Sequence, residues 1–178
     1  MVEKNPGQNI SRTIKTCKLD PKFKYEISQI PGAEKLKLCF QCGTCTADCP
    51  IARFSTIYNP RKLMRMTLLG MKDRVLSNEA IWLCAACFTC VDHCPQGVNI
   101  ASVLRALRNL AVIEGIIPQV FIEITRNIKM TGCAYRIPEF RLKKRIEKGL
   151  PPLPKTNIKA IGKLLDLLEV SNLKTVKH

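Results

Sequence analysis

The chain has 178 residues, of which 46% are hydrophobic and only 6% aromatic, and its formal net charge is +15. This length allows one domain or a core with appendages, and the low aromatic content favours an aliphatic, helix-rich core. No apolar run reaches the ~18 residues of a membrane span, and the first residues lack the apolar stretch of a secretory signal. Ten cysteines then favour metal ligation over disulfides, so we expect a reducing, cytoplasmic location.

Residues 1–38 are predicted to form an N-terminal arm and an irregular lead-in. The first 16 residues are polar without a clear period. Pro21, Pro31 and Gly32 then separate short apolar pieces, which indicates irregular structure with one short helix.

A cysteine pattern occurs twice between residues 39 and 95. The first ladder is Cys39-x-x-Cys42-x-x-Cys45-x-x-x-Cys49-Pro50, and the second is Cys84-x-x-Cys87-x-x-Cys90-x-x-x-Cys94-Pro95. A straight helix cannot bring three thiolates to one metal cube. The first three cysteines of each ladder are therefore predicted to lie in a wrapping loop.

This spacing is typical of 4Fe-4S clusters, in which four thiolates bind one iron each. In two-cluster ferredoxins with this spacing, the fourth cysteine of a ladder ligates the other cluster. We therefore predict two 4Fe-4S clusters, the first held by Cys39, Cys42, Cys45 and Cys94 and the second by Cys84, Cys87, Cys90 and Cys49. Structural zinc explains the pattern less well, because it does not require the third cysteine or the closing proline. Disulfides conflict with the expected compartment.

Residues around the ladders are predicted to support the clusters. Small side chains let the backbone approach the sulfides: Gly43, Thr44, Ala47, Ala85, Ala86 and Thr89. Apolar side chains expected to exclude water, or to form ordinary core, are Phe40, Ile51, Phe54, Trp82, Phe88, Val98 and Ile100. His93 is expected to face a loop or solvent, since the cysteines already complete both clusters. Cys17 and Cys133 are interpreted as buried structural thiols.

Helical patterns fill the segment between the ladders. Asn59-Pro60 is an N-cap followed by a proline in the first turn, and Gly70 ends the run. A short helix with Val75 and Leu76 is expected next, and Ser77 is expected to cap a further helix that carries Ile81 and Trp82. These insertions argue against a small βαβ ferredoxin.

Further helices are predicted after the second ladder. Asn99 caps one that ends at Gly115, with Val103, Leu104, Leu107, Leu110 and Ala111 on one face. A second runs from Pro118 to Gly132 with Val120, Phe121, Ile124 and Ile128 inward. A basic segment follows at 138–148, then a proline-rich linker at 151–154 and an amphipathic helix from Ile158 to Leu168. That terminal helix either docks on a partner or folds back on its own chain.

The predicted fold class is therefore mainly α. We expect an α-helical two-cluster (2x 4Fe-4S) ferredoxin-like domain at 39–132 with a helical appendage and a C-terminal tail. The extension at 133–178 is basic and contains the proline-rich linker and the terminal amphipathic helix. The sequence has no G-x-G-x-x-G motif, no phosphate-binding Walker loop and no nucleophile–base motif, and it lacks Cys-Cys-Gly repeats. We expect no active site of its own.

The stretch from Cys39 to Pro50 resembles the iron–sulfur C subunits of the heterodisulfide reductases of methanogenic archaea. Leu19-Asp20-Pro21, Trp82-Leu83-Cys84 and the remainder of the second ladder are similar to that family too. The resemblance covers roughly residues 17–155. The ladder alone occurs in many redox subunits, whereas the Gln-Cys-Gly-Thr-Cys context in a short chain is more selective.

The resemblance implies an electron-relay subunit in a cytoplasmic hetero-oligomer. In the family, this relay passes electrons from a flavin-containing subunit to a catalytic subunit, whose Cys-Cys-Gly-bound clusters reduce the CoM-S-S-CoB heterodisulfide in methanogenesis. A hydrogenase or formate dehydrogenase joins the complex, and electrons bifurcate at the flavin. The alternatives are a relay subunit of another dehydrogenase or reductase, or a freely diffusing ferredoxin. Nucleic-acid binding through the +15 charge ranks last, because no recognition motif is present.

Overall fold

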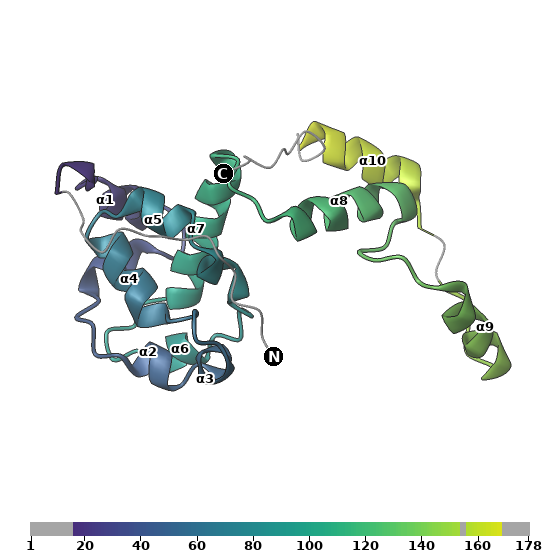
Figure 1. Cartoon of the computed structure of the whole chain (residues 1–178), viewed down its shortest axis with the longest axis horizontal. Coiled ribbons are helices and arrows are strands. Elements are labelled where there is room, and N and C mark those ends of the chain that lie inside the picture. Colours follow the sequence, from purple (N-terminus) through teal and green to yellow (C-terminus); the bar gives the residue numbers. More distant parts are fainter. Residues whose placement is uncertain (1–15, 154–155, 169–178) are drawn as a thin grey trace. The chain divides into compact units, whose positions relative to one another are not determined.

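The computed structural model describes residues 16–153 and 156–168, all as helices and connecting turns with no strand among them. Part of the predicted arm and of the proline-rich linker therefore lies outside the described residues. In chain order, with η for 3-10 helices, the elements are η1 (Thr16–Lys18), α1 (Phe23–Ser28), η2 (Glu34–Leu38), α2 (Thr44–Ala47), α3 (Pro50–Phe54), α4 (Pro60–Leu68), α5 (Lys72–Leu76), η3 (Glu79–Leu83), α6 (Thr89–Asp92), α7 (Ile100–Ile113), α8 (Gln119–Thr131), α9 (Glu139–Glu147) and α10 (Ile158–Leu167) (Figure 1). The mainly helical class is confirmed.

The chain divides into two compact units, the first up to Arg108 and the second from Asn109 onward. Helix α7 continues across this division. The sequence-based boundary after residue 132 falls inside the second unit. Both ladders lie in the first unit.

The core of the first unit is built from helices far apart in the sequence. Its largest fully buried side chains are Phe23, Ile27, Leu36, Leu63, Met64, Leu76, Ile81, Leu104, Leu107, Val75, Val98 and Val103. Phe23 and Ile27 lie one helical turn apart on α1, so both point inward together. Helix α1 is the short helix expected within the lead-in, and it supplies part of the core.

Helix α4 begins and ends as predicted. The Asn59 side chain accepts a hydrogen bond from the backbone N–H of Lys62 at 2.9 Å, and Gly70 takes a left-handed conformation with φ +72°. The Gly70 carbonyl accepts the backbone N–H of Asp20 at 2.8 Å. This bond fixes the segment before α1 against the end of α4.

Two other predicted caps had different outcomes. Asn99 caps α7, since its side-chain oxygen accepts the backbone N–H of Ser102 at 2.9 Å. Ser77 does not cap the following helix. Its hydroxyl donates back to the Asp73 carbonyl at 2.6 Å, and Asn78 caps η3 by accepting the Ala80 N–H at 2.9 Å.

In the second unit, α8 and α10 pack against each other (Figure 1). The Lys129 ammonium and the Asp166 carboxylate join them at 2.6 Å. The terminal helix thus folds back on its own chain, one of the two expected outcomes. Helix α8 runs from Pro118 to Gly132 as predicted, but Val120 and Phe121 are exposed rather than inward.

Candidate metal centre

Each ladder forms a turn whose backbone is left-handed at two equivalent positions. In the first ladder these are Gln41 and Gly43, with φ of 66° and 95°. In the second they are Ala86 and Phe88, with φ of 50° and 63°. Such values are uncommon for residues other than glycine, so the shared geometry is a specific local structure that both copies adopt.

A short helix follows the turn in each ladder. Helix α2 carries Cys45 and helix α6 carries Cys90. The predicted wrapping loop therefore contains only the first two cysteines of each ladder. The third cysteine lies on the short helix, which begins directly after a left-handed residue.

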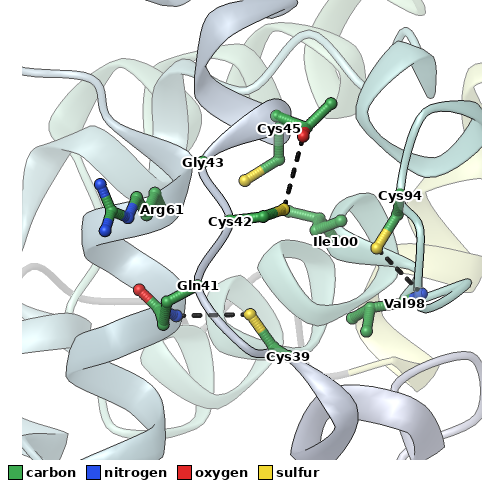
Figure 2. A pocket seen from close by; sticks show the side chains of 10 residues that line it. Cys39, Gln41, Cys42, Gly43, Cys45, Arg61, Cys94, Val98 and Ile100 are labelled. Carbon is green, nitrogen blue, oxygen red and sulfur yellow. Dashed lines mark hydrogen bonds between the residues drawn. The ribbon is translucent and has the colours of Figure 1, made fainter.

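The fold brings Cys94 from the second ladder to the first three cysteines of the first ladder. Cys39, Cys42, Cys45 and Cys94 line one small pocket together with Val98 and Ile100. Its empty space, part of which is open to solvent, is about 320 Å³. In Figure 2 the four sulfur atoms lie around this space.

The pKa of Cys45 indicates the same grouping of thiols. Burial first, and then the neighbouring Cys39, Cys42 and Cys94, raise the pKa of Cys45 to about 11. A hydrogen bond with Thr46 opposes this rise in pKa only in part. These three thiols are the predicted first-cluster partners of Cys45.

The second ladder forms a corresponding group with Cys49. Burial raises the pKa of Cys90 to about 12, and Cys84, Cys45, Cys49 and Cys87 add to the rise. Cys49 itself is buried. Because Cys45 also acts on Cys90, the two groups of thiols lie close enough to interact through their charges.

The middle cysteine of each ladder behaves differently from the third. Cys42 and Cys87 are exposed, and threonine hydroxyls lie 3.4 Å and 3.5 Å from their sulfurs. Hydrogen bonding to Thr44 lowers the pKa of Cys42, and bonding to Thr89 lowers the pKa of Cys87. Both threonines, predicted only as small residues, therefore favour the thiolate that binds iron.

Other donors reach the sulfurs at the edges of each group. The Gln41 side-chain nitrogen donates to Cys39 Sγ at 3.3 Å, and the backbone N–H of Val98 donates to Cys94 Sγ at 3.3 Å. In the second ladder, the backbone N–H of Ala86 donates to Cys84 Sγ at 3.4 Å. Such N–H···S bonds are one of the means by which proteins set cluster potentials.

Tyr58 is a site residue that the sequence-based prediction missed. Tyr58 is only 3% exposed. Burial first, and then interactions with Cys84, Cys49 and Cys90, raise the pKa of its hydroxyl far above the ordinary range, so the hydroxyl stays protonated. Its position just before the Asn59-Pro60 helix start was the only available signal.

Helices α2 and α6 pack together and bring the two ladders side by side. His93 Nδ1 lies 2.7 Å from the Asp48 carboxylate, and both residues directly precede the fourth cysteine of their ladder. His93 is exposed, as predicted, and this contact gives it a bridging role. On the other side of α2, the Thr46 hydroxyl accepts the Arg61 backbone N–H at 2.9 Å, which connects the first ladder to α4.

Only some of the predicted water-excluding residues have that position. Val98 and Ile100 are buried and line the pocket. Phe40 is 59% exposed, Phe54 is 92% exposed and Phe88 is also exposed. The prediction was wrong for these three phenylalanines, because each occupies an outward position on a turn or short helix that no other element covers within the described residues.

The donor set fits 4Fe-4S clusters. Each group offers four sulfurs and N–H donors directed at them, the chemistry that such clusters take. Within the described residues, no three His, Cys, Asp or Glu side chains are arranged around a single metal ion. Cys133 is half-buried in the second unit, and the side chain of Cys17 lies outside the described part. No helix in that part is long and apolar enough to cross a membrane.

Comparison with known proteins identifies the class first. Residues 35–98, which contain both ladders, match the family described as "4Fe-4S dicluster domain". The chain is therefore a helical iron–sulfur protein that carries 4Fe-4S clusters, with a role in electron transfer.

Similarity over most of the chain then identifies the family. The chain is 33% identical to the iron-sulfur C subunit of the "CoB--CoM heterodisulfide reductase" of Methanopyrus kandleri, over 87% of each protein. It is 33% identical to the C subunit of the "H(2):CoB-CoM heterodisulfide,ferredoxin reductase" of Methanothermobacter thermautotrophicus, over 84% of this chain and 80% of the relative. It is 39% identical to the C subunit of the "Ferredoxin:CoB-CoM heterodisulfide reductase" of Methanosarcina mazei, over 66% of this chain and 72% of the relative. The chain belongs to the family of heterodisulfide reductase C subunits, whose members are parts of an oxidoreductase complex.

Proposed function

We propose that this chain is the two-cluster electron relay of a heterodisulfide reductase. It accepts electrons from a flavin-containing partner and passes them to a catalytic partner, where Cys-Cys-Gly-bound clusters reduce the CoM-S-S-CoB heterodisulfide. The observation that carries this proposal is the pocket that Cys94 of the second ladder lines together with Cys39, Cys42 and Cys45 of the first. Family membership supplies the reaction, since the relatives named above are subunits of heterodisulfide reductases.

In this proposal, the first 4Fe-4S cluster is held by Cys39, Cys42, Cys45 and Cys94, and the second by Cys84, Cys87, Cys90 and Cys49. The pocket that contains Cys94 supports the first set, and the influence of Cys49 on the Cys90 thiol supports the second. When bound, each cluster supplies a one-electron store. The exchanged cysteines hold the two sites together as one unit.

The chain's own residues have three tasks in this relay. The half-buried third cysteines lie on α2 and α6, and the packing of these helices brings the two sites near each other. Threonine hydroxyls and backbone N–H groups stabilise the thiolates. Buried Val98 and Ile100 limit water at the first site. These features support conduction, and we propose that the heterodisulfide reacts on another subunit.

We further propose that the complex works in the cytoplasm, together with a hydrogenase or a formate dehydrogenase. The ladder thiols need a reducing compartment, and the name of one relative includes H(2) as a reactant. A second relative, from Methanococcus maripaludis, is named as the C2 subunit of an "H(2)/formate:CoB-CoM heterodisulfide,ferredoxin reductase". The +15 charge of this chain suits acidic partner surfaces.

Gentle anaerobic purification of the tagged chain from its native host tests the role. We expect about eight irons per chain, from two clusters of four, and co-purifying subunits that contain flavin and Cys-Cys-Gly repeats. Adding the CoM-S-S-CoB heterodisulfide to the reduced complex should reoxidise the clusters. An iron-loaded chain without partners would favour a freely diffusing ferredoxin, and partners of another dehydrogenase would favour that alternative.

The exchange of the fourth cysteines needs its own test with single Cys→Ser variants. If the ligands cross, Cys39→Ser and Cys94→Ser damage the same cluster, and Cys84→Ser and Cys49→Ser damage the other. Each variant should retain about four of about eight irons. Electron paramagnetic resonance of the reduced protein distinguishes the two signals. If Cys39→Ser and Cys49→Ser instead removed the same cluster signal, the exchange of the fourth cysteines would be refuted.

A further inference from the structure

The first cysteine of the first ladder accepts a hydrogen bond from a side chain that is not itself a predicted cluster ligand. Cys39 Sγ accepts from the Gln41 side-chain nitrogen at 3.3 Å. The equivalent position in the second ladder is Ala86, which has no polar side chain. The first site therefore receives an amide donor that the second ladder does not repeat.

The orientation of the Gln41 amide follows from the chemistry of its partner. A thiolate only accepts hydrogen bonds, so the amide must present its N–H to Cys39 rather than its carbonyl. The carbonyl oxygen of Gln41 is then buried without a hydrogen-bond partner in the described structure. Its backbone is also left-handed, with φ 66°, a conformation that glycine or asparagine adopts more readily.

Both features of Gln41 cost stability. An apolar side chain of similar size would avoid the unpaired oxygen and still fill the space. The only favourable polar contact of the side chain within the described residues is the one with Cys39 Sγ. Figure 2 shows this amide directed along the edge of the first site toward that sulfur.

We propose that Gln41 is a positioning residue that sets the reduction potential of the first cluster separately from that of the second. This inference rests on the proposed function, because it assumes that both sites hold clusters. Reduction adds one electron from a donor such as a reduced flavin, and no bond forms or breaks. The added negative charge spreads onto the cysteine sulfurs, so a donor there stabilises the reduced form more than the oxidised form.

The Gln41→Leu substitution removes the donor with little change in shape, and it also removes the unpaired oxygen. In this variant we expect the first cluster to become harder to reduce. Its reduced-to-oxidised ratio at a fixed potential should fall about tenfold, which corresponds to about 59 mV for one electron.

A potentiometric titration followed by electron paramagnetic resonance measures this shift. The sample is the full chain, purified anaerobically with its accompanying subunits, with dithionite as reductant. The spectral loss in Cys39→Ser and Cys84→Ser identifies which signal belongs to which site. We expect Gln41→Leu to move only the first signal, so the second signal in the same sample is the internal control.

The possible results separate the inference from the proposed function. Two signals with unshifted potentials in Gln41→Leu, or a shift of the second signal in that variant, would overturn the inference and leave the relay role intact. Iron content that stays at the native level, combined with a shift of the first signal alone, would support both. A native chain that binds no cluster would overturn both.

Discussion

Gly70 is the point where the end of helix α4 meets the segment that leads into α1. Its backbone is left-handed with φ +72°, and a Cβ atom added there would lie 2.1 Å from the backbone oxygen of Asp20. That oxygen accepts the Phe23 N–H at 3.2 Å, and the Gly70 carbonyl accepts the Asp20 N–H at 2.8 Å. Because backbone atoms surround the site, Gly70→Ala forces the Asp20 segment to move.

The expected cost of Gly70→Ala has two parts. A left-handed alanine costs about 1–2 kcal/mol, partly offset by the stiffer unfolded chain. Loss of the two backbone hydrogen bonds adds about 1 kcal/mol each. The sum is about 3 kcal/mol, which should lower the hydrogen-exchange protection of buried amides in α1 and α4 by about 100-fold.

Gly97→Ala is the matched control within the same unit. Gly97 has φ +59°, but among the residues that the structure describes an added Cβ would meet only the flexible Lys35 ammonium, at 3.4 Å. This variant should show the conformational cost alone, about 1 kcal/mol or roughly fivefold in protection. Hydrogen exchange by mass spectrometry on both variants gives the comparison. Equal losses of protection would refute the argument that the Asp20 contact dominates.

Three further results are expected. In the metal-free chain at pH 9, Cys45 and Cys90 should alkylate at least about 50-fold more slowly than Cys42 and Cys87, because the raised pKa values of Cys45 and Cys90 leave roughly 1% thiolate or less. Peptide mass spectrometry measures the four rates, and similar rates would contradict the effect of burial on the pKa. Leu104→Ala, in the core of the first unit, should lower the free energy of unfolding by about 2–5 kcal/mol. Hydrogen exchange measures this change, and a decrease below about 1 kcal/mol would show that the core repacks. Binding of the chain to its partner subunits should weaken steeply with added salt, because its net charge is +15. Pull-downs at increasing salt test this, and binding that does not change with salt would argue against a charged interface.

Local sequence signals predicted the helices well and the site in outline. Asn59 and Asn99 cap their helices as expected, since a capping side chain needs only the N–H groups two or three residues ahead. The ladder spacing also marked the eight cysteines that the fold gathers into two groups. Their assignment as crossed ligands remains a prediction, for which the position of Cys94 beside the first ladder is supporting evidence.

Local sequence signals did not predict which side chains are buried or which residues surround the sulfurs. Phe54 and Phe23 are both phenylalanines in short helices, yet Phe54 is exposed and Phe23 is fully buried. The difference depends on whether another element covers the residue, and hydrophobic type alone does not specify this. The packing of α10 on α8 was likewise one of two outcomes that an amphipathic pattern allows.

The sequence by itself determined which atoms can bind metal, because the spacing of cysteines along a short turn limits what their thiolates can reach. Only the tertiary structure decided what surrounds those atoms. Buried Tyr58 lies near Cys84 although 26 positions of the sequence separate them, and Gln41 reaches Cys39 because a left-handed turn folds its side chain back. Contacts of this kind depend on the path of the whole backbone, since a side chain meets distant residues only after the helices between them have packed.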